Sequence, residues 1–148
     1  NGVRNGDARA ILKSTRQLMG NACLGCHAGF RDGQAGVRDS VLFMTSFLSY
    51  WRDINRGLMV RDFGLVEVRA RELAALTEVV GKDESLEENF GLGGPRQRRK
   101  FREYLNVVGS NATTIAAASE SKDVATILDS FDVLWADGCV SCHDKFRK

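Results

Sequence analysis

DVATILDSFDVLWADGCVSCHDKFRK, residues 123–148, is the most informative part of this chain. Its large apolar residues recur at intervals of three and four, which is the period of a helix with one buried face. On that face we place Val124, Ile127, Leu128, Phe131, Leu134, Trp135 and Gly138. The face leads directly into a pair of cysteines. The segment therefore predicts an amphipathic helix that carries a cysteine motif against the core.

The same unit occurs a second time, near the start of the chain. Residues 7–31 align without gaps on residues 123–147. The shared positions are Asp7, Ile11, Leu12, Ser14, Leu18, Cys23, Cys26, His27, Phe30 and Arg31, which recur as Asp123, Ile127, Leu128, Ser130, Leu134, Cys139, Cys142, His143, Phe146 and Arg147. In the first copy Thr15 replaces Phe131 and Met19 replaces Trp135, so we expect looser packing there.

Both copies end in the pattern C-x-x-C-H, as CLGCH at residues 23–27 and CVSCH at residues 139–143. These motifs use all four cysteines and both histidines of the chain. Two thiols at this spacing can each form a thioether to a haem vinyl group, and the next histidine can be the proximal iron ligand. The sequence therefore predicts two covalently bound haem c groups. One would be held by Cys23, Cys26 and His27, and the other by Cys139, Cys142 and His143.

Two other uses of the cysteine pairs remain open. A C-x-x-C pair can be a redox disulfide, and two pairs can hold a structural zinc ion. However, the pairs of a zinc ribbon are separated by a short loop, whereas Cys26 and Cys139 lie far apart in the chain. A redox disulfide gives no reason for the histidine that follows each pair.

Length and composition are those of a soluble globular domain. The chain has 148 residues, of which 43% are hydrophobic and 27% charged. No apolar run approaches the roughly 18 residues that a membrane helix needs, so we expect no membrane span. The formal net charge of +2 is too small to indicate nucleic-acid binding.

Three further helices are predicted between the two copies. The first follows Asp39 as a candidate cap, the second runs from about Gly64 to Val80 behind Asp62 and stops at Gly81, and the third opens at Pro95 and ends before a polar turn at 119–122. Residues 81–94, rich in glycine and acidic residues, are predicted to be a loop. The expected buried stripes are Met44, Phe47, Leu48, Trp51, Ile54 and Leu58; Val66, Leu73, Leu76 and Val80; and Phe101, Tyr104, Leu105, Val108, Ala112 and Ile115.

These helices predict an all-α fold, an antiparallel four-helix bundle over residues 38–148, preceded by a haem-bearing helix and linker at residues 1–37. A bundle that ends in CVSCHDKFR resembles cytochrome c-prime and its low-spin relatives. The resemblance implies that His143 is the proximal ligand and that Arg147 lies near the haem on that side. By the same comparison, Arg31 lies near the first haem.

The additional N-terminal helix departs from that family. It is similar to the last helix of a preceding bundle whose first three helices are absent. We expect it to dock on the bundle as a fifth element. The alternatives are that it completes a core with a region outside this sequence or with a second chain, as in a homodimer that exchanges this helix.

The sixth iron ligand decides what each haem can do. Both histidines are assigned proximally, which leaves Met19, Met44, Met59, a lysine or no ligand at all. Met19 lies on the attachment side of its own haem. The resemblance implies a distal residue from the stretch 41–44, where Met44 is the candidate ligand of the second haem. Alternatively, Met44 packs in the core and the iron is five-coordinate.

Two functions are consistent with these features. The first is electron transfer between redox partner proteins, with the chain an electron carrier rather than an enzyme, although it could belong to a larger redox enzyme. The second is binding of a small gas, NO or CO, at a five-coordinate iron. The basic residues in the stretch 96–102 could dock an acidic partner or could be a solvated face. The resemblance implies a periplasmic location.

Overall fold

The computed structural model describes residues 39–83, 90 and 92–146. This part of the chain is helical and contains no strand, which confirms the all-α class for the described residues. Its elements are α3 (Asp39–Met59), α4 (Phe63–Lys82), α6 (Pro95–Ser121), α7 (Val124–Val133), the π-helical η2 (Leu134–Val140) and α8 (Ser141–Phe146). The last three follow one another without a break, and together they are called the C-terminal rod below. The predicted N-terminal haem helix lies outside the described residues.

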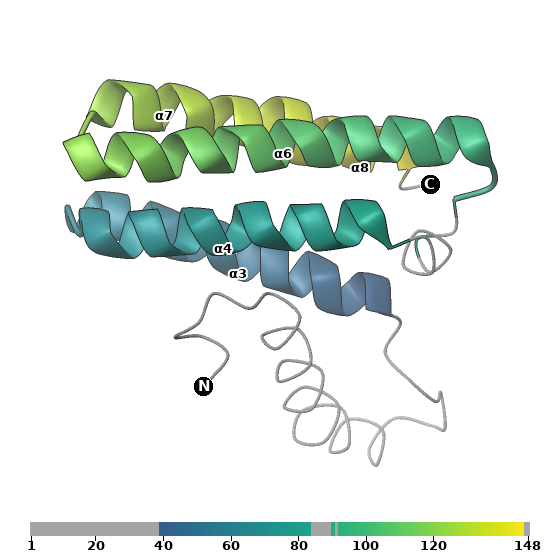
Figure 1. Ribbon diagram of the computed structural model, residues 1–148, viewed down its shortest axis with the longest axis horizontal. Helices are drawn as coiled ribbons and strands as arrows, with labels where there is room; N and C mark the ends of the chain where they lie inside the picture. The colour runs from purple at the N-terminus through teal and green to yellow at the C-terminus, as the bar shows by residue number, and fades with distance from the viewer. Residues whose placement is uncertain (1–38, 84–89, 91, 147–148) are drawn as a thin grey trace, which may run out of the picture.

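The helices are arranged in two pairs. α4 lies along α3 on one side and along α6 on the other, and α6 in turn lies along α7 and η2. Figure 1 shows α6 and the C-terminal rod above α3 and α4. Each helix therefore has a neighbour against which to bury an apolar stripe.

Two of the helices begin at side-chain caps. The Leu65 backbone N–H donates a hydrogen bond to Asp62 Oδ1 at 3.0 Å, which confirms the predicted cap of α4. The Thr126 backbone N–H donates to Asp123 Oδ1 at 3.2 Å at the start of α7. The Thr126 hydroxyl also donates to Asp123, and these hydrogen bonds lower the pKa of the Asp123 carboxyl.

Two predicted helix ends were wrong. Gly81 does not stop α4, which continues one residue further to Lys82. α6 extends through the predicted polar turn to Ser121. Its left-handed cap is Lys122, at φ 57°, and the Asp123 N–H then donates to the Ala118 carbonyl at 2.9 Å.

The core is divided into two clusters along the length of the helices. The first is centred on Ile54, Val66, Ala70, Leu73, Val108, Ala112, Ile115, Ile127 and Leu134. The second contains Phe43, Leu76, Val80, Leu92, Phe101 and Leu105. The buried positions predicted for α4 are confirmed, as are those predicted for α6 except Tyr104, which is half-buried.

Part of the predicted apolar face is exposed, which corrects the expectation for α3 and for the C-terminal rod. Leu48 is 48% exposed, Val124 45%, Leu128 48% and Trp135 41%. The rod packs against α6 through the edge of its stripe that carries Ile127, Leu134 and Gly138. The other edge turns away from α6 and stays at the surface. Helical period alone did not reveal how narrow the buried edge would be.

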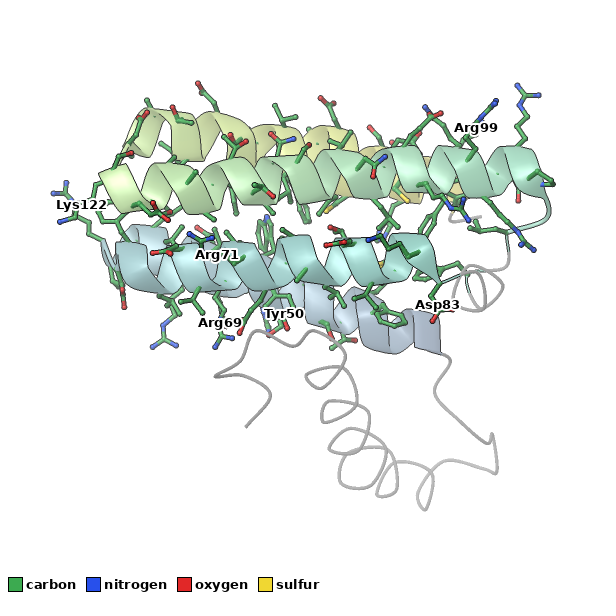
Figure 2. All side chains as sticks on the ribbon, in the orientation of Figure 1. Tyr50, Arg69, Arg71, Asp83, Arg99 and Lys122 are labelled. Atoms are coloured by element: carbon green, nitrogen blue, oxygen red, sulfur yellow. The ribbon has the colours of Figure 1, made fainter. Side chains whose placement is uncertain are left out.

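Ion pairs join the helices on their outer sides. Arg69 Nε lies 3.1 Å from Asp53 of α3 and its Nη1 lies 2.7 Å from Glu72, while Arg71 pairs with Glu120 of α6. Figure 2 shows Arg69 and Tyr50 close together on the side of α4 away from α6. Burial, and to a smaller extent the negative charge of Glu72, raises the pKa of Tyr50.

None of the described helices is long and apolar enough to span a membrane.

Candidate functional site

The second cysteine pair lies on the C-terminal rod, with Cys139 in η2 and Cys142 in α8. Both are free thiols and both are half-buried. Cys139 packs against the first core cluster, whereas Cys142 packs against the second. Both side chains therefore contact the interior at the same end of the rod.

The surroundings of these thiols differ from those of a redox dithiol. Burial raises the pKa of Cys139 to about 11, and burial together with the neighbouring Cys139 raises the pKa of Cys142 to about 11. Reactive C-x-x-C thiols have lowered pKa values, because a nearby positive charge or helix start stabilises the thiolate. Here the thiols are protonated at neutral pH. This observation weighs against the redox-disulfide alternative for this pair.

Aromatic rings make up much of the cluster that Cys142 packs against. Phe90 packs on Phe101 with ring centroids 4.7 Å apart and on Phe43 at 6.4 Å. Phe146 meets the edges of Phe101 and Tyr104, each at 6.2 Å. These rings come from α3, α6, α8 and the chain before α6. The sulfur thus contacts an apolar region that four separate segments build.

A π-helical turn precedes and includes the first cysteine of the pair. Within η2 the helix is widened, and the Ser141 backbone N–H donates to the Ala136 carbonyl five residues earlier. The Ser141 hydroxyl donates to the same carbonyl at 2.9 Å. π-helical segments are rare and frequently lie at functional sites. The π-helical turn therefore distinguishes the backbone around Cys139, at the start of CVSCH, from the α-helical parts of the rod.

Gly138 allows the rod to approach α6 closely beside Cys139. A Cβ at this position would lie 2.5 Å from Val108 Cγ2, well inside van der Waals contact. Val108 is β-branched and lies within a helix, so its side chain has little freedom to move away. Only a glycine permits this spacing between η2 and α6.

We expect Gly138→Ala to destabilise the protein by about 1–3 kcal/mol, the usual cost of an overpacked core. Denaturant unfolding of the full chain measures the change. Adding Val108→Ala should restore part of the loss, since it removes the methyl group that the new Cβ meets. Gly64→Ala is the control, because a Cβ there would find no atom closer than 3.5 Å. Equal stability of the Gly138→Ala and Gly64→Ala variants would refute the close approach.

The structure describes only some of the other predicted site residues. His143 follows Cys142 on α8 and is exposed. Arg147 lies outside the described residues, as do the first-site residues Cys23, Cys26, His27 and Arg31. Met44 is half-buried, and its neighbour Phe43, at 3% exposure, belongs to the cluster that contacts Cys142.

Sequence reasoning missed two contributors to this region. Phe90 and Leu92 lie in the stretch predicted to be a loop, yet Leu92 is buried and Phe90 packs between Phe43 and Phe101. The available signal was the presence of large apolar side chains in a segment otherwise rich in glycine and acidic residues. Such isolated residues in a polar loop commonly return to a core.

Trp51, which packs on the rings of Phe131 and Trp135, has a buried N–H group that makes no hydrogen bond within the described residues. Its ring stacks on Phe131 at 5.5 Å and lies 4.7 Å from the ring of Trp135. A buried donor without a partner usually points to a group still to be accounted for.

Comparisons with protein-family models, with curated proteins and with solved structures gave no match to this chain. The site must therefore be interpreted from its own residues. The residues that a covalently attached haem would use are two half-buried thiols three positions apart, each packed against an apolar cluster, and an exposed histidine that follows them. The orphaned Trp51 donor is compatible with a further group in the same region.

Proposed function

We propose that this protein is a dihaem c-type cytochrome that carries electrons between redox partners. The main support is that Cys139 and Cys142 turn their sulfurs toward an apolar, aromatic interior, at the spacing that haem attachment requires. The repeat of the motif at residues 23–27 extends the same interpretation to a second group.

We also propose that the described helices form an antiparallel four-helix bundle of the cytochrome c-prime type over residues 38–148. In support, α3, α4, α6 and the C-terminal rod each bury a stripe in shared clusters. Aromatic contacts between Trp51 and the rod join the first helix to the last. The cysteine pair then lies near the C-terminal end, as in the resembled family.

Each residue of the site has a separate task. Cys139 and Cys142 would hold the group through their sulfurs, and His143 would supply a nitrogen ligand to its iron. The bound haem supplies one-electron redox chemistry. Phe43 and Phe101 are buried in the cluster that Cys142 packs against, so they would give a group held there an apolar surround, and burial of this kind tunes a haem's reduction potential.

Redox titration of the purified protein tests this function. We expect two one-electron steps for each polypeptide, one for each haem. The measurement is a potentiometric titration followed by visible absorbance. A chain that takes up a single electron, or none, would contradict the proposal.

Gas binding is the second candidate function, and Phe43 favours it. In the stretch where the resembled family places its distal residue, Phe43 rather than Met44 belongs to the cluster around Cys142. A phenyl ring cannot ligate iron. The haem on the C-terminal rod would then be five-coordinate and open to NO or CO.

Addition of CO to the reduced protein should shift the visible bands of the C-terminal haem, and Met44→Leu should leave that shift unchanged. If the unaltered protein shows no shift and Met44→Leu creates one, Met44 is the sixth ligand and electron transfer alone remains. Phe43→Ala is a useful comparison, because opening the interior should raise the CO association rate without changing the ligand.

A redox partner and a periplasmic location complete the proposal. Arg96 and Arg99 are exposed on the first turns of α6, and Figure 2 shows Arg99 pointing away from the helices. This positive surface would suit an acidic partner protein. Covalent haem attachment of this type, by the family resemblance, takes place in the periplasm.

A further inference from the structure

Large apolar side chains remain exposed on the face that α3 and the C-terminal rod form together. Leu48 and Met59 lie on α3, and Val124, Leu128 and Trp135 lie on the rod. We call these five residues the α3–rod face. A patch of exposed apolar side chains with polar groups around it commonly marks an interaction site.

Aromatic contacts mark the line where α3 and the rod meet. Trp51 of α3 packs on the rings of Phe131 and Trp135. α4 lies against a different side of α3, where Asp53 pairs with Arg69. The exposed side chains beside the three rings therefore belong to one surface, on the far side of α3 from α4.

Two rows of apolar side chains flank that line. On α3, Leu48 lies three residues before the tryptophan of the line, and Met59 lies three helical turns after Leu48. On the rod, Leu128 lies three residues before the phenylalanine of the line, and Val124 lies one turn earlier still. Residues at such spacings share one side of a helix, so both rows contribute to the same surface.

Opposite charges lie at the outer edges of the two rows. Arg52 and Arg56 are exposed on α3, and Asp129 and Asp132 are exposed on the rod. Arg52 and Asp132 each follow, by one residue, a ring that faces the other helix, so each points about 100° away from that helix. None of the four charges forms an ion pair with another residue that the structure describes. The α3 edge of the face is therefore positive, and the rod edge is negative.

α3 and the rod run antiparallel. Phe43, near the start of α3, belongs to the cluster against which Cys142 packs, near the end of the rod. Trp51 contacts the rod at Phe131 and Trp135, which come earlier in the chain than Cys142. Trp51 is therefore level with the middle of the stretch 131–135.

We propose that two copies of this chain associate through the α3–rod face, about a two-fold axis parallel to the helices, so that α3 of each subunit lies on the rod of the other. An axis in this direction keeps every residue at its own level along the bundle. Counted along the antiparallel helices from the Trp51 contact, Arg52 is level with Asp132, and Arg56 is within one residue of the level of Asp129. Arg52 then faces Asp132 of the partner subunit, and Arg56 faces Asp129 of the partner subunit, with the apolar rows between them.

A second copy fits this face for two reasons. The charges match twice, because a two-fold axis repeats each contact, and the positive edge of each subunit meets the negative edge of the other. The face is also large enough. It is about 30 Å long and about 20 Å wide, from the length of the 21-residue α3 and the width of two helices. The resulting area of about 600 Å² per subunit approaches the roughly 800 Å² that each partner buries in a specific interface.

Sedimentation velocity of the full-length protein over a range of concentrations tests the association. We expect a dimer that dissociates on dilution. Leu128→Asp should raise the dimer Kd by about tenfold or more, because each subunit then places a charge in the apolar contact. Val133→Asp is the matched control, since Val133 is also exposed but lies two residues after Phe131, on the opposite side of the rod. It should leave Kd unchanged, and circular dichroism should show the same helix content in both variants.

Charge reversal tests the two-fold arrangement. Arg52→Asp and Asp132→Arg should each raise Kd by about two- to thirtyfold, because each change disrupts two ion pairs. An equimolar mixture of these two variants should form a heterodimer with nearly the original affinity, since each altered residue then faces an opposite charge on the other chain. Mixing cannot restore an ion pair that forms within one chain, so this result is specific to contacts between subunits.

A protein that stays monomeric at every concentration would overturn the proposal. Equal effects of Leu128→Asp and Val133→Asp would do so as well, and so would a mixture of Arg52→Asp and Asp132→Arg that associates no better than either variant alone. The interface contains no residue of the C-x-x-C-H motif, so it does not depend on the proposed function. A dimer with these properties in a chain without haem would keep the interface and reject the cytochrome assignment.

Discussion

Replacing Cys139 and Cys142 together with alanine should remove half of the visible haem absorbance per polypeptide. Without either thioether, the second haem has no covalent attachment, and His143 alone cannot retain it through denaturation. The measurement is the reduced absorbance of the denatured protein relative to polypeptide concentration, with the unaltered chain as reference.

The matched variants make this result specific. Cys23→Ala with Cys26→Ala should remove the other half, and all four substitutions together should remove the whole. Val140→Ala changes an exposed residue inside the second motif and should leave the absorbance intact. Full absorbance after loss of Cys139 and Cys142 would show that these thiols hold no haem.

Leu134→Ala should destabilise the protein by about 2–5 kcal/mol, the usual cost of removing a fully buried leucine. Leu134 is 1% exposed and belongs to the first core cluster, one helical turn before the cysteine pair. The loss would appear as a lower denaturant midpoint of the haem-loaded protein. Because the cavity lies close to Cys139, we also expect the visible bands of the second haem to broaden.

Leu128→Ala is the control for this prediction, since Leu128 lies on the same rod but is 48% exposed. Its replacement should change the free energy of unfolding by no more than about 1 kcal/mol. If the two variants were equally stable, the rod would not pack against α6 through the edge that carries Leu134.

The helical core was largely predictable because α4 and α6 each lie between two neighbours. Val66, Leu73 and Ile115 were predicted from their spacing and are buried. Leu48 and Leu128 fit the same spacing and are exposed, because burial depends on which edge of a stripe meets a partner. Which edge of the stripe is buried depends on the packing angle between the helices, and the period of the sequence does not reveal that angle.

The cysteine motif is visible in the sequence because its residues are neighbours in the chain, and the haem that it indicates stays a prediction. The ring cluster around Cys142 was not visible in this way, since Phe90 reaches it through a tertiary contact between distant segments. Which of Phe43 and Met44 lies in the cluster that Cys142 packs against was equally inaccessible, because adjacent helical residues point about 100° apart. Met44 as an iron ligand stays a prediction.

The mass of the intact denatured polypeptide tests the central claim most directly. We predict the mass of the unmodified chain plus two haems, with none of the four cysteines open to alkylation. The mass of the bare polypeptide, with four thiols that alkylate freely, would contradict the assignment of both motifs.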